Sequence, residues 1–252
     1  MVPNVKLLLE EGELLYDPGK YMKLVGKLNY LTVTRPNVAF DVSVVSQFMS
    51  SSQISHWNAV IHILRYLKNS PGMGIFYSNQ GHTWISGYSD TSHAGCPLSG
   101  RSTTGYCIYY GGNLISWKSK KQNVVSLSSV ETEYRAIART ACELTWVRRL
   151  VQELGDVFTG LMEMYCDNEA SMHISKNHIF HERTKHIEVE CHYVREKIVG
   201  TENEPPSIEP VWVKTTVQVA DILTKPFGGP QIESICNKLG MINIYVPTWG
   251  VL

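Results

Sequence analysis

The stretch TWISGYSDTSHAGCPLSGRSTTGYCIYYGGNLISWK, residues 83–118, decides the fold class of this 252-residue chain. Residues 83–89 have the character of a β-strand that ends at Asp90, and residues 104–110 alternate as a second strand. The glycine pair at 111–112 then favours a tight hairpin turn, because glycine tolerates the backbone angles that such turns need. A third strand is therefore expected at 114–117.

Helices and strands alternate along the rest of the chain. Ser128 and Glu131 have the spacing of a helix capping box, and the apolar stripe after them predicts a helix that ends near Leu154. Further strands are expected at 161–166 and 208–214. Shorter helices are expected over 169–177, 183–198 and 231–239, near Gln218, and in an upstream module between residues 21 and 68. The pattern predicts an α/β fold.

Composition limits the classes of function. Lys plus Arg and Asp plus Glu both number 23, so the formal net charge is zero, and a polyanionic partner needs a local basic patch. The sequence has no apolar run long enough to span a membrane, and its acidic start is unlike a signal peptide. We therefore expect an intracellular protein, cytoplasmic or nuclear, whose six cysteines are reduced thiols.

Two acidic residues occupy the same place relative to predicted strands. Asp90 and Asp167 each directly follow a strand, and ligands bind at the carboxyl ends of strands in α/β sheets. If the two strands are parallel neighbours, the carboxylates face each other and need a cation between them. Oxygen ligands suit Mg²⁺ or Mn²⁺. The alternative is that each Asp only forms a turn.

Several motifs, in order along the chain, resemble the end of the Pol polyprotein of copia-type LTR retrotransposons. Six match its ribonuclease H domain: YSDTSHAG (88–95), GRSTTGYCIYYGGNLISWKSKKQ (100–122), SSVETEYRAIA (128–138), YCDNEAS (165–171), HERTKHIEVECHYVRE (181–196) and QVADILTK (218–225). Two more resemble the connection between reverse transcriptase and ribonuclease H: KLVGKLNYLTVTRPNVAF (23–40) and HWNAVIHILRYLK (56–68). The polymerase motif Tyr-x-Asp-Asp is absent, which indicates the C-terminal end of Pol without its palm.

The resemblance implies a fold and a set of boundaries. It implies a ribonuclease H-like five-stranded mixed sheet flanked by helices, preceded by a small helical module. We expect a linker at 1–20, the helical connection region at 21–80, the ribonuclease H-like domain at 81–228 and a C-terminal tail at 229–252. The expected partners are an RNA–DNA hybrid duplex and the reverse transcriptase of the same polyprotein, with no membrane and no small-molecule cofactor.

The resemblance also implies four catalytic acids that hold two Mg²⁺ or Mn²⁺ ions. They are Asp90, Glu133, Asp167 and Asp221, placed by their motifs. Bound ions would support hydrolysis of RNA in an RNA–DNA hybrid. Outside these motifs, Glu133 and Asp221 would be read as ordinary surface charges of helices, and Glu131 is read as a capping residue.

A local basic excess lies beside the expected site. Residues 101–150 contain eight Lys or Arg and three Glu. The expected phosphate contacts are Arg101, Lys118, Lys120 and Lys121. The alternative is a solvated hairpin end.

Some residues depart from the family pattern. Ser92 and His93 stand where the family commonly has Asp-Trp. Lys214-Thr215-Thr216 occupies the loop in which cellular ribonucleases H carry a histidine. Five of nine histidines fall between 173 and 192, but their spacing does not favour zinc. The alternative function is a catalytically decayed fragment that keeps the fold and only binds nucleic acid or a polymerase partner.

Overall fold

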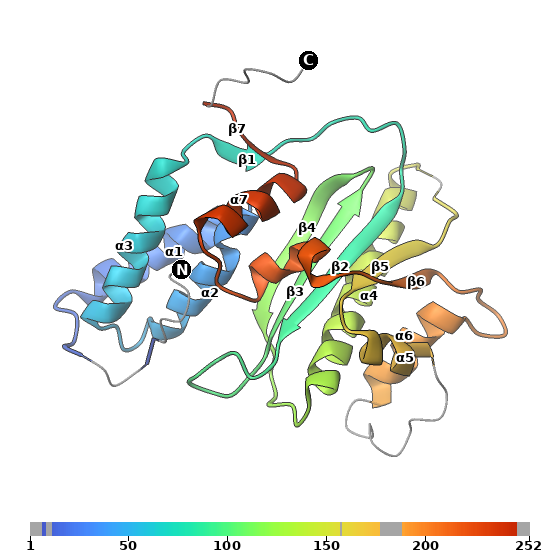
Figure 1. The fold of residues 1–252 in the computed structure, drawn as a ribbon, viewed down its shortest axis with the longest axis horizontal. Coiled ribbons are helices and arrows are strands. Elements are labelled where there is room, and N and C mark those ends of the chain that lie inside the picture. The colour runs from blue at the N-terminus through green and yellow to red at the C-terminus, as the bar shows by residue number, and fades with distance from the viewer. Residues whose placement is uncertain (1–6, 9–11, 157, 177–187, 246–252) are drawn as a thin grey trace. The chain divides into compact units, whose positions relative to one another are not determined.

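The computed structural model describes residues 7–8, 12–156, 158–176 and 188–245. The chain divides into two compact units, one made of residues 78–224 and the other of residues 1–77 with 225–252. Figure 1 shows the helices and strands of both units.

The unit 78–224 is built on a five-stranded mixed sheet with the strand order β4-β3-β2-β5-β6. Its strands are β2 (Ile85–Ser92), β3 (Thr103–Tyr110), β4 (Asn113–Lys121), β5 (Met162–Cys166) and β6 (Ile208–Trp212). β2, β3 and β4 pair in antiparallel fashion, whereas β2, β5 and β6 are parallel. The five-stranded mixed sheet and the parallel neighbours expected from the sequence are confirmed.

The hairpin between β3 and β4 follows from its glycines. Gly111 and Gly112 have φ angles of 55° and 73°, which lie in the left-handed region that glycine enters without a steric penalty. A two-residue turn of this kind matches the twist of the flanking strands. The hairpin therefore sets the register of β3 against β4.

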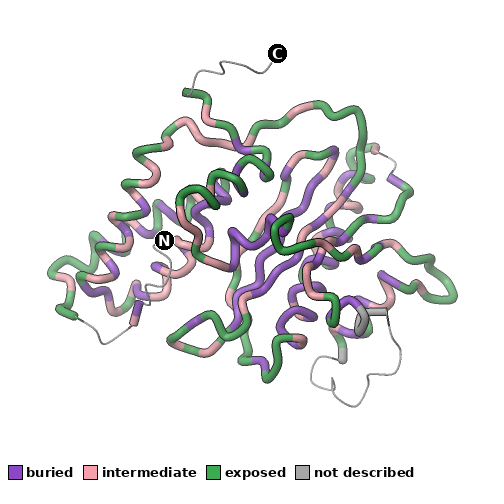
Figure 2. Tube along the Cα trace, in the orientation of Figure 1, coloured by how far each residue is buried: buried purple, intermediate pink, exposed green. Residues whose placement is uncertain are grey.

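The long helix α4 (Ser129–Glu153) covers one face of the sheet and packs on β2 and β3. It approaches β2 closely at Gly87, where an added Cβ would lie 2.9 Å from Ile108 Cδ1 and 3.3 Å from Leu144 Cδ2. Figure 2 shows buried positions along the strands and along α4. The core between them includes Ile85, Ile108, Tyr134, Ile137, Leu144, Met162, Met164 and Ile208.

Smaller elements complete this unit. They are α5 (Glu169–Lys176), α6 (Glu188–Val199), η4 (Thr215–Val217) and η5 (Val219–Leu223). α6 packs against α4, α5 and β6, so the α4 face of the sheet carries a helical layer. The N-terminal part of the helix expected at 183–198, and with it His178, His181 and His186, lies outside the described residues.

The η5 segment is a 3-10 helix that packs on β2 and β3. It contacts β3 at Gly105, whereas Ile108 belongs to the core with α4. Residues three apart on a strand point to opposite faces, so η5 lies on the face opposite α4. The strand β2 also continues to Ser92, so Asp90 lies near the end of its strand and not directly after it.

The other unit is mainly helical. It contains α1 (Pro18–Leu31), η1 (Pro36–Val38), α2 (Ala39–Val45), η2 (Ser46–Phe48), α3 (Ile54–Asn69) and α7 (Gly229–Lys238). Two short strands, β1 (Met73–Ile75) and β7 (Met241–Asn243), pair in antiparallel fashion. The short helix expected at 231–239 is α7, and both α7 and β7 belong to the same unit as residues 1–77.

Polar side chains buried in the helical unit are satisfied locally. The Arg35 guanidinium donates to the carbonyl oxygen and hydroxyl of Ser70, each at 3.2 Å. His56 is fully buried, accepts from the Gln53 backbone N–H through Nδ1 at 3.1 Å, and contacts Leu8 O through Nε2 at 2.9 Å. The Arg35 bonds join the end of α3 to an earlier segment, and the His56 contacts join its start to Gln53 and Leu8.

None of the helices within the described residues is long and apolar enough to cross a lipid bilayer.

Candidate active site

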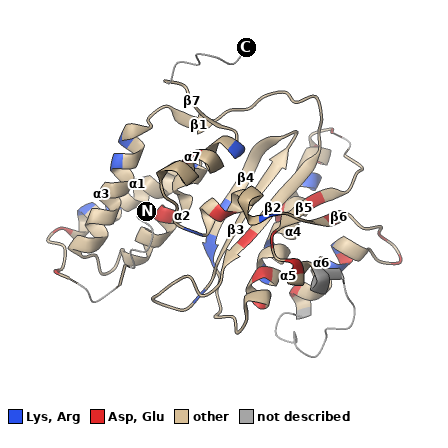
Figure 3. Cartoon of the chain, in the orientation of Figure 1, with Lys and Arg blue, Asp and Glu red and all other residues tan. Residues whose placement is uncertain are grey.

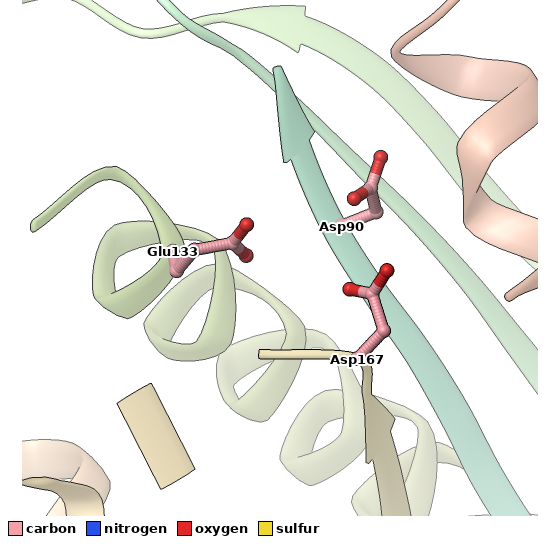
Figure 4. Close-up of side chains that lie close together, drawn as sticks. All are labelled: Asp90, Glu133 and Asp167. Atoms are coloured by element: carbon pink, nitrogen blue, oxygen red, sulfur yellow. The ribbon is translucent and has the colours of Figure 1, made fainter. Parts of the chain in front are cut away.

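Three acidic side chains from three different elements meet at one end of the sheet. Asp90 comes from β2, Glu133 from α4, and Asp167 directly follows β5. Each offers one carboxylate oxygen, and these three atoms all lie within 4.8 Å of one another. Figure 4 shows the Glu133 carboxylate pointing from α4 toward the two aspartates. Asp90 and Glu133 are only 1% and 9% exposed.

The parallel pairing of β2 with β5 brings the two aspartates together. Tyr88 pairs with Tyr165 in register, and each tyrosine lies two residues before its aspartate. Neighbouring strands lie about 4.8 Å apart. The predicted juxtaposition of Asp90 and Asp167 therefore follows from strand register.

The N-terminal turn of α4 places Glu133. The Ser128 hydroxyl accepts from the Glu131 backbone N–H at 3.2 Å, and Glu131 Oε2 accepts from the Leu127 N–H at 3.0 Å. Glu131 also pairs with Arg135 at 3.2 Å. Glu131 thus caps the helix, as expected, while Glu133 points to the acidic group.

The fourth expected acid, Asp221, is not one of the three clustered carboxylates. It lies in η5 and is buried. The segment that carries it packs against β2, the strand of Asp90. The structure therefore gathers three of the four expected acids, and a ligand role for Asp221 stays a prediction.

Hydroxyl and amide groups surround the carboxylates. Thr215 Oγ1 donates to Asp167 Oδ2 at 3.0 Å, and Thr224 Oγ1 donates to Asp90 Oδ2. Gln218 Nε2 donates to the carbonyl oxygen of Ser89 at 2.9 Å. Neither Gln218 nor Thr224 has a feature in the sequence that marks it as a site residue, although both flank Asp221 in the motif QVADILTK. Thr215 was noted only as part of the loop that lacks a histidine.

The negative charge of the cluster affects the pKa of the neighbouring Cys166 thiol. The pKa of this thiol is raised to about 12, first by burial and then by the negative charges of Glu133, Asp167 and Asp90. Three acids that close together disfavour one another's ionised forms unless a cation is present. Their all-oxygen donor set fits Mg²⁺ or Mn²⁺, which prefer carboxylate oxygens.

A basic groove lies between β4 and α4, with a volume of about 420 Å³. Its cationic side chains are Lys118, Lys120, Lys121, Arg135 and Arg139, and its acidic ones are Glu143 and Glu190. Figure 3 shows the Lys and Arg positions along the chain. Three of the four expected phosphate contacts thus line one groove. Arg101 is not among the residues that line it.

The groove adjoins the strand that neighbours the acidic site. Thr104 lines the groove, and the next residue, Gly105, pairs in register with Asp90. Arg135 of α4 forms a salt bridge with Glu190 of α6 at 3.1 Å. Arg139 is exposed at the groove.

Known proteins align with this chain over all or nearly all of its length. No family model matches the sequence. The retrovirus-related Pol polyprotein from transposon RE2 of Arabidopsis thaliana is 38% identical over 252 residues, which is 100% of this chain. The retrovirus-related Pol polyprotein from transposon TNT 1-94 of Nicotiana tabacum is 37% identical over 231 residues, or 91% of this chain. This chain spans only 17% of the length of each of these two relatives.

Among solved structures, the crystal structure of LC11-RNase H1 in complex with an RNA/DNA hybrid aligns with 56% of this chain and 93% of that chain. The TM-score is 0.39 and the sequence identity is 16%. The fold of this chain is defined by its own strand order, β4-β3-β2-β5-β6.

Proposed function

Because this chain belongs to the family of retrovirus-related Pol polyproteins from copia-type transposons, we propose that residues 78–224 hydrolyse RNA in RNA–DNA hybrids. The proposed reaction is endonucleolytic and depends on Mg²⁺ or Mn²⁺. The observation that carries this proposal is the convergence of Asp90, Glu133 and Asp167, whose carboxylate oxygens lie within 4.8 Å of one another.

The three carboxylates would hold the divalent ions, with Asp221 as the fourth proposed ligand. Two bound ions would activate a water molecule on one side of the phosphorus and stabilise the leaving 3′-oxygen on the other. Thr215 donates a hydrogen bond to the Asp167 carboxylate, and Thr224 donates one to that of Asp90. Hydrogen bonds of this kind fix ligand geometry around metal sites.

The hybrid duplex is proposed to reach the basic groove. Lys118, Lys120 and Lys121 contact phosphates there, and Arg101 contributes from the neighbouring loop. Contacts to phosphates position a duplex but do not read its sequence. Discrimination of RNA from DNA would come from 2′-hydroxyl contacts across the shallow minor groove of the hybrid. The reverse transcriptase of the same polyprotein is the proposed protein partner.

A cleavage assay tests the proposal. A duplex with one labelled RNA strand is incubated with the full chain in the presence of Mg²⁺, Mn²⁺ or a chelator. The expected result is metal-dependent fragments that carry 5′-phosphates, and no cleavage of the same sequence as duplex DNA. If the chain binds the hybrid but leaves it intact with both metals, it is the decayed, binding-only fragment, and the catalytic proposal is wrong.

A further inference from the structure

The η5 segment, which carries Asp221, is held against the sheet by side chains on both of its sides. On the N-terminal side, Gln218 is 2% exposed, and its Nε2 donates to the Ser89 carbonyl oxygen at 2.9 Å. Its Oε1 accepts from the Ala220 backbone N–H at 3.2 Å. One side chain therefore caps η5 and attaches it to the residue before Asp90.

On the C-terminal side, Thr224 makes the matching attachment. It is 2% exposed, and its hydroxyl donates to Asp90 Oδ2. Its backbone N–H donates to the Asp221 carbonyl oxygen at 3.0 Å. The two attachments lie three residues before and three residues after Asp221, and both end at β2.

A glycine on β3 allows η5 to approach this closely. An added Cβ at Gly105 would lie 2.7 Å from Thr224 Cγ2, 2.8 Å from Leu223 Cβ and 3.0 Å from Ala220 O. Gly105 pairs in register with Asp90. The position without a side chain, Gly105, is therefore the β3 neighbour of Asp90, the aspartate to which Thr224 donates.

We propose that Gln218 and Thr224 are positioning residues, which together fix the carboxylate of Asp90 and hold η5, with Asp221, at the acidic site. A 3-10 helix of five residues has few hydrogen bonds of its own and poor bond geometry, so its position depends on attachments to its surroundings. A hydroxyl held on one carboxylate oxygen also restricts rotation of the Asp90 carboxylate. This inference rests on the proposed function, because it assigns the two residues to the geometry of the metal-binding acids.

The test distinguishes the effect of the Thr224 hydroxyl from the effect of the packing of this side chain. Thr224→Val keeps the shape and removes the hydroxyl, whereas Thr224→Ser keeps the hydroxyl. Thr140→Val is the matched control, because Thr140 is also fully buried but donates only to the Ala136 carbonyl oxygen within α4. Gln218→Met removes the amide donor and takes the place of Thr224→Val if that variant does not show a cooperative melt.

Binding of Mn²⁺ alone to the full chain is measured by titration calorimetry and by the metal-induced shift in melting temperature. Loss of a group that orients a ligand typically weakens metal affinity about 10–100-fold, and we expect a loss in this range for Thr224→Val. Thr224→Ser should restore wild-type affinity, and Thr140→Val should lower stability without changing affinity. In hybrid cleavage, kcat should fall for Thr224→Val while KM stays unchanged. Wild-type Mn²⁺ affinity in Thr224→Val, or an equal loss in Thr224→Ser, would overturn the inference.

Amide hydrogen exchange of metal-free protein distinguishes this inference from the proposed function. If wild-type protein neither binds Mn²⁺ nor cleaves hybrid, the proposed function fails. The attachment of η5 is then judged from the exchange rates of the amides of residues 219–223. These rates should rise in Thr224→Val and stay at the wild-type value in Thr224→Ser and Thr140→Val. Unchanged exchange in Thr224→Val overturns the attachment itself.

Discussion

Tyr88 of β2 and Tyr165 of β5 pair in register across parallel strands, with their ring centroids 4.6 Å apart. Each lies two residues before an aspartate of the candidate site. The side-chain period of a strand is two residues, so each aspartate lies on the same face of its strand as its tyrosine. A slip of one residue would turn one strand's side chains to the other face. The tyrosine pair therefore marks the register on which the site depends.

Removing one charge from the cluster should separate a metal ligand from a structural aspartate. Asp90→Asn and Asp167→Asn should leave metal-free protein as stable as wild type or more stable, because like charges are no longer crowded. Hybrid cleavage should fall by at least about 100-fold, since even loss of an orienting group costs about 10–100-fold. The Mn²⁺-induced rise in melting temperature, which reflects binding to the native state, should shrink.

Glu153→Gln is the matched control, because Glu153 is an exposed acid at the far end of α4. It should retain both cleavage and the thermal response to Mn²⁺. The two-metal interpretation is wrong if the Asn variants melt lower without metal and shift as much as wild type with it.

The strands of the five-stranded sheet and two of the three clustered acids could be predicted from the sequence because they depend on local patterns. Alternation marks the strands, and Asp90 and Asp167 were placed by the ends of those strands. Glu133 required the resemblance, since a helix carries many acids and periodicity alone does not choose among them. The strands β1 and β7 were not predicted, because each has only three residues and too few positions to show alternation.

The attachments around the acids could not be predicted in this way. The bond from Gln218 to Ser89 joins residues 129 positions apart, and that from Thr224 to Asp90 joins residues 134 positions apart. No local pattern encodes which distant carbonyl or carboxylate a buried polar side chain will reach. The close approach of η5 to Gly105 likewise becomes visible only in the folded structure.

The basic groove should control binding of the hybrid and not the chemical step. The double variant Lys118→Gln/Lys120→Gln should raise KM and leave kcat nearly unchanged. It should reduce the magnitude of the salt slope of binding by roughly 2, because each neutralised phosphate contributes about 0.9 to that slope for duplex DNA. Fluorescence anisotropy of a labelled hybrid across a salt series measures this slope.

The charge-matched control is Arg148→Gln/Arg149→Gln, near the other end of α4 from Arg135. Its slope and KM should match those of wild type. An equal reduction of the slope in both double variants would show that the groove is not the binding surface.

Gly87 should be intolerant of a side chain. A Cβ there would lie 2.9 Å from Ile108 Cδ1 and 3.3 Å from Leu144 Cδ2, so Gly87→Ala would displace the ends of these side chains from their packing between the sheet and α4. Overpacking of this kind costs about 1–3 kcal/mol, which denaturant unfolding can measure. The comparison is Gly26→Ala in α1, where a Cβ meets no atom within 4 Å. That variant should be neutral or stabilising, because alanine favours helices over glycine.

One thiol should react quickly in the native protein, and all six should react after denaturation. All six cysteines are free, and only Cys142 is exposed. Burial raises the pKa of Cys166 to about 12 and that of Cys236 to about 11, which suppresses the reactive thiolate. Burial also acts to raise the pKa of Cys96, but hydrogen bonds, the one from Lys121 foremost, lower it overall, so the slow reaction expected there rests on its low exposure alone. Titration with a chromogenic disulfide reagent should give one fast thiol in the native chain and none in Cys142→Ser. Any fast thiol in that variant would contradict the burial of the other five cysteines.

Acid should destabilise the helical unit through His56. Burial lowers the pKa of this imidazole below its usual 6.5, so the folded state keeps it neutral. Protonation would put a proton on Nδ1, which accepts from the Gln53 N–H. Below about pH 6.5 the unfolded chain binds a proton that the folded chain does not, so the free energy of unfolding should fall as pH decreases and level off below the folded-state pKa. Denaturant unfolding from pH 7.5 to 5 should show a shallower fall in His56→Gln, whereas His82→Gln, at an exposed histidine, should keep the wild-type slope. Equal slopes in wild type and His56→Gln would mean that His56 does not cause this pH dependence.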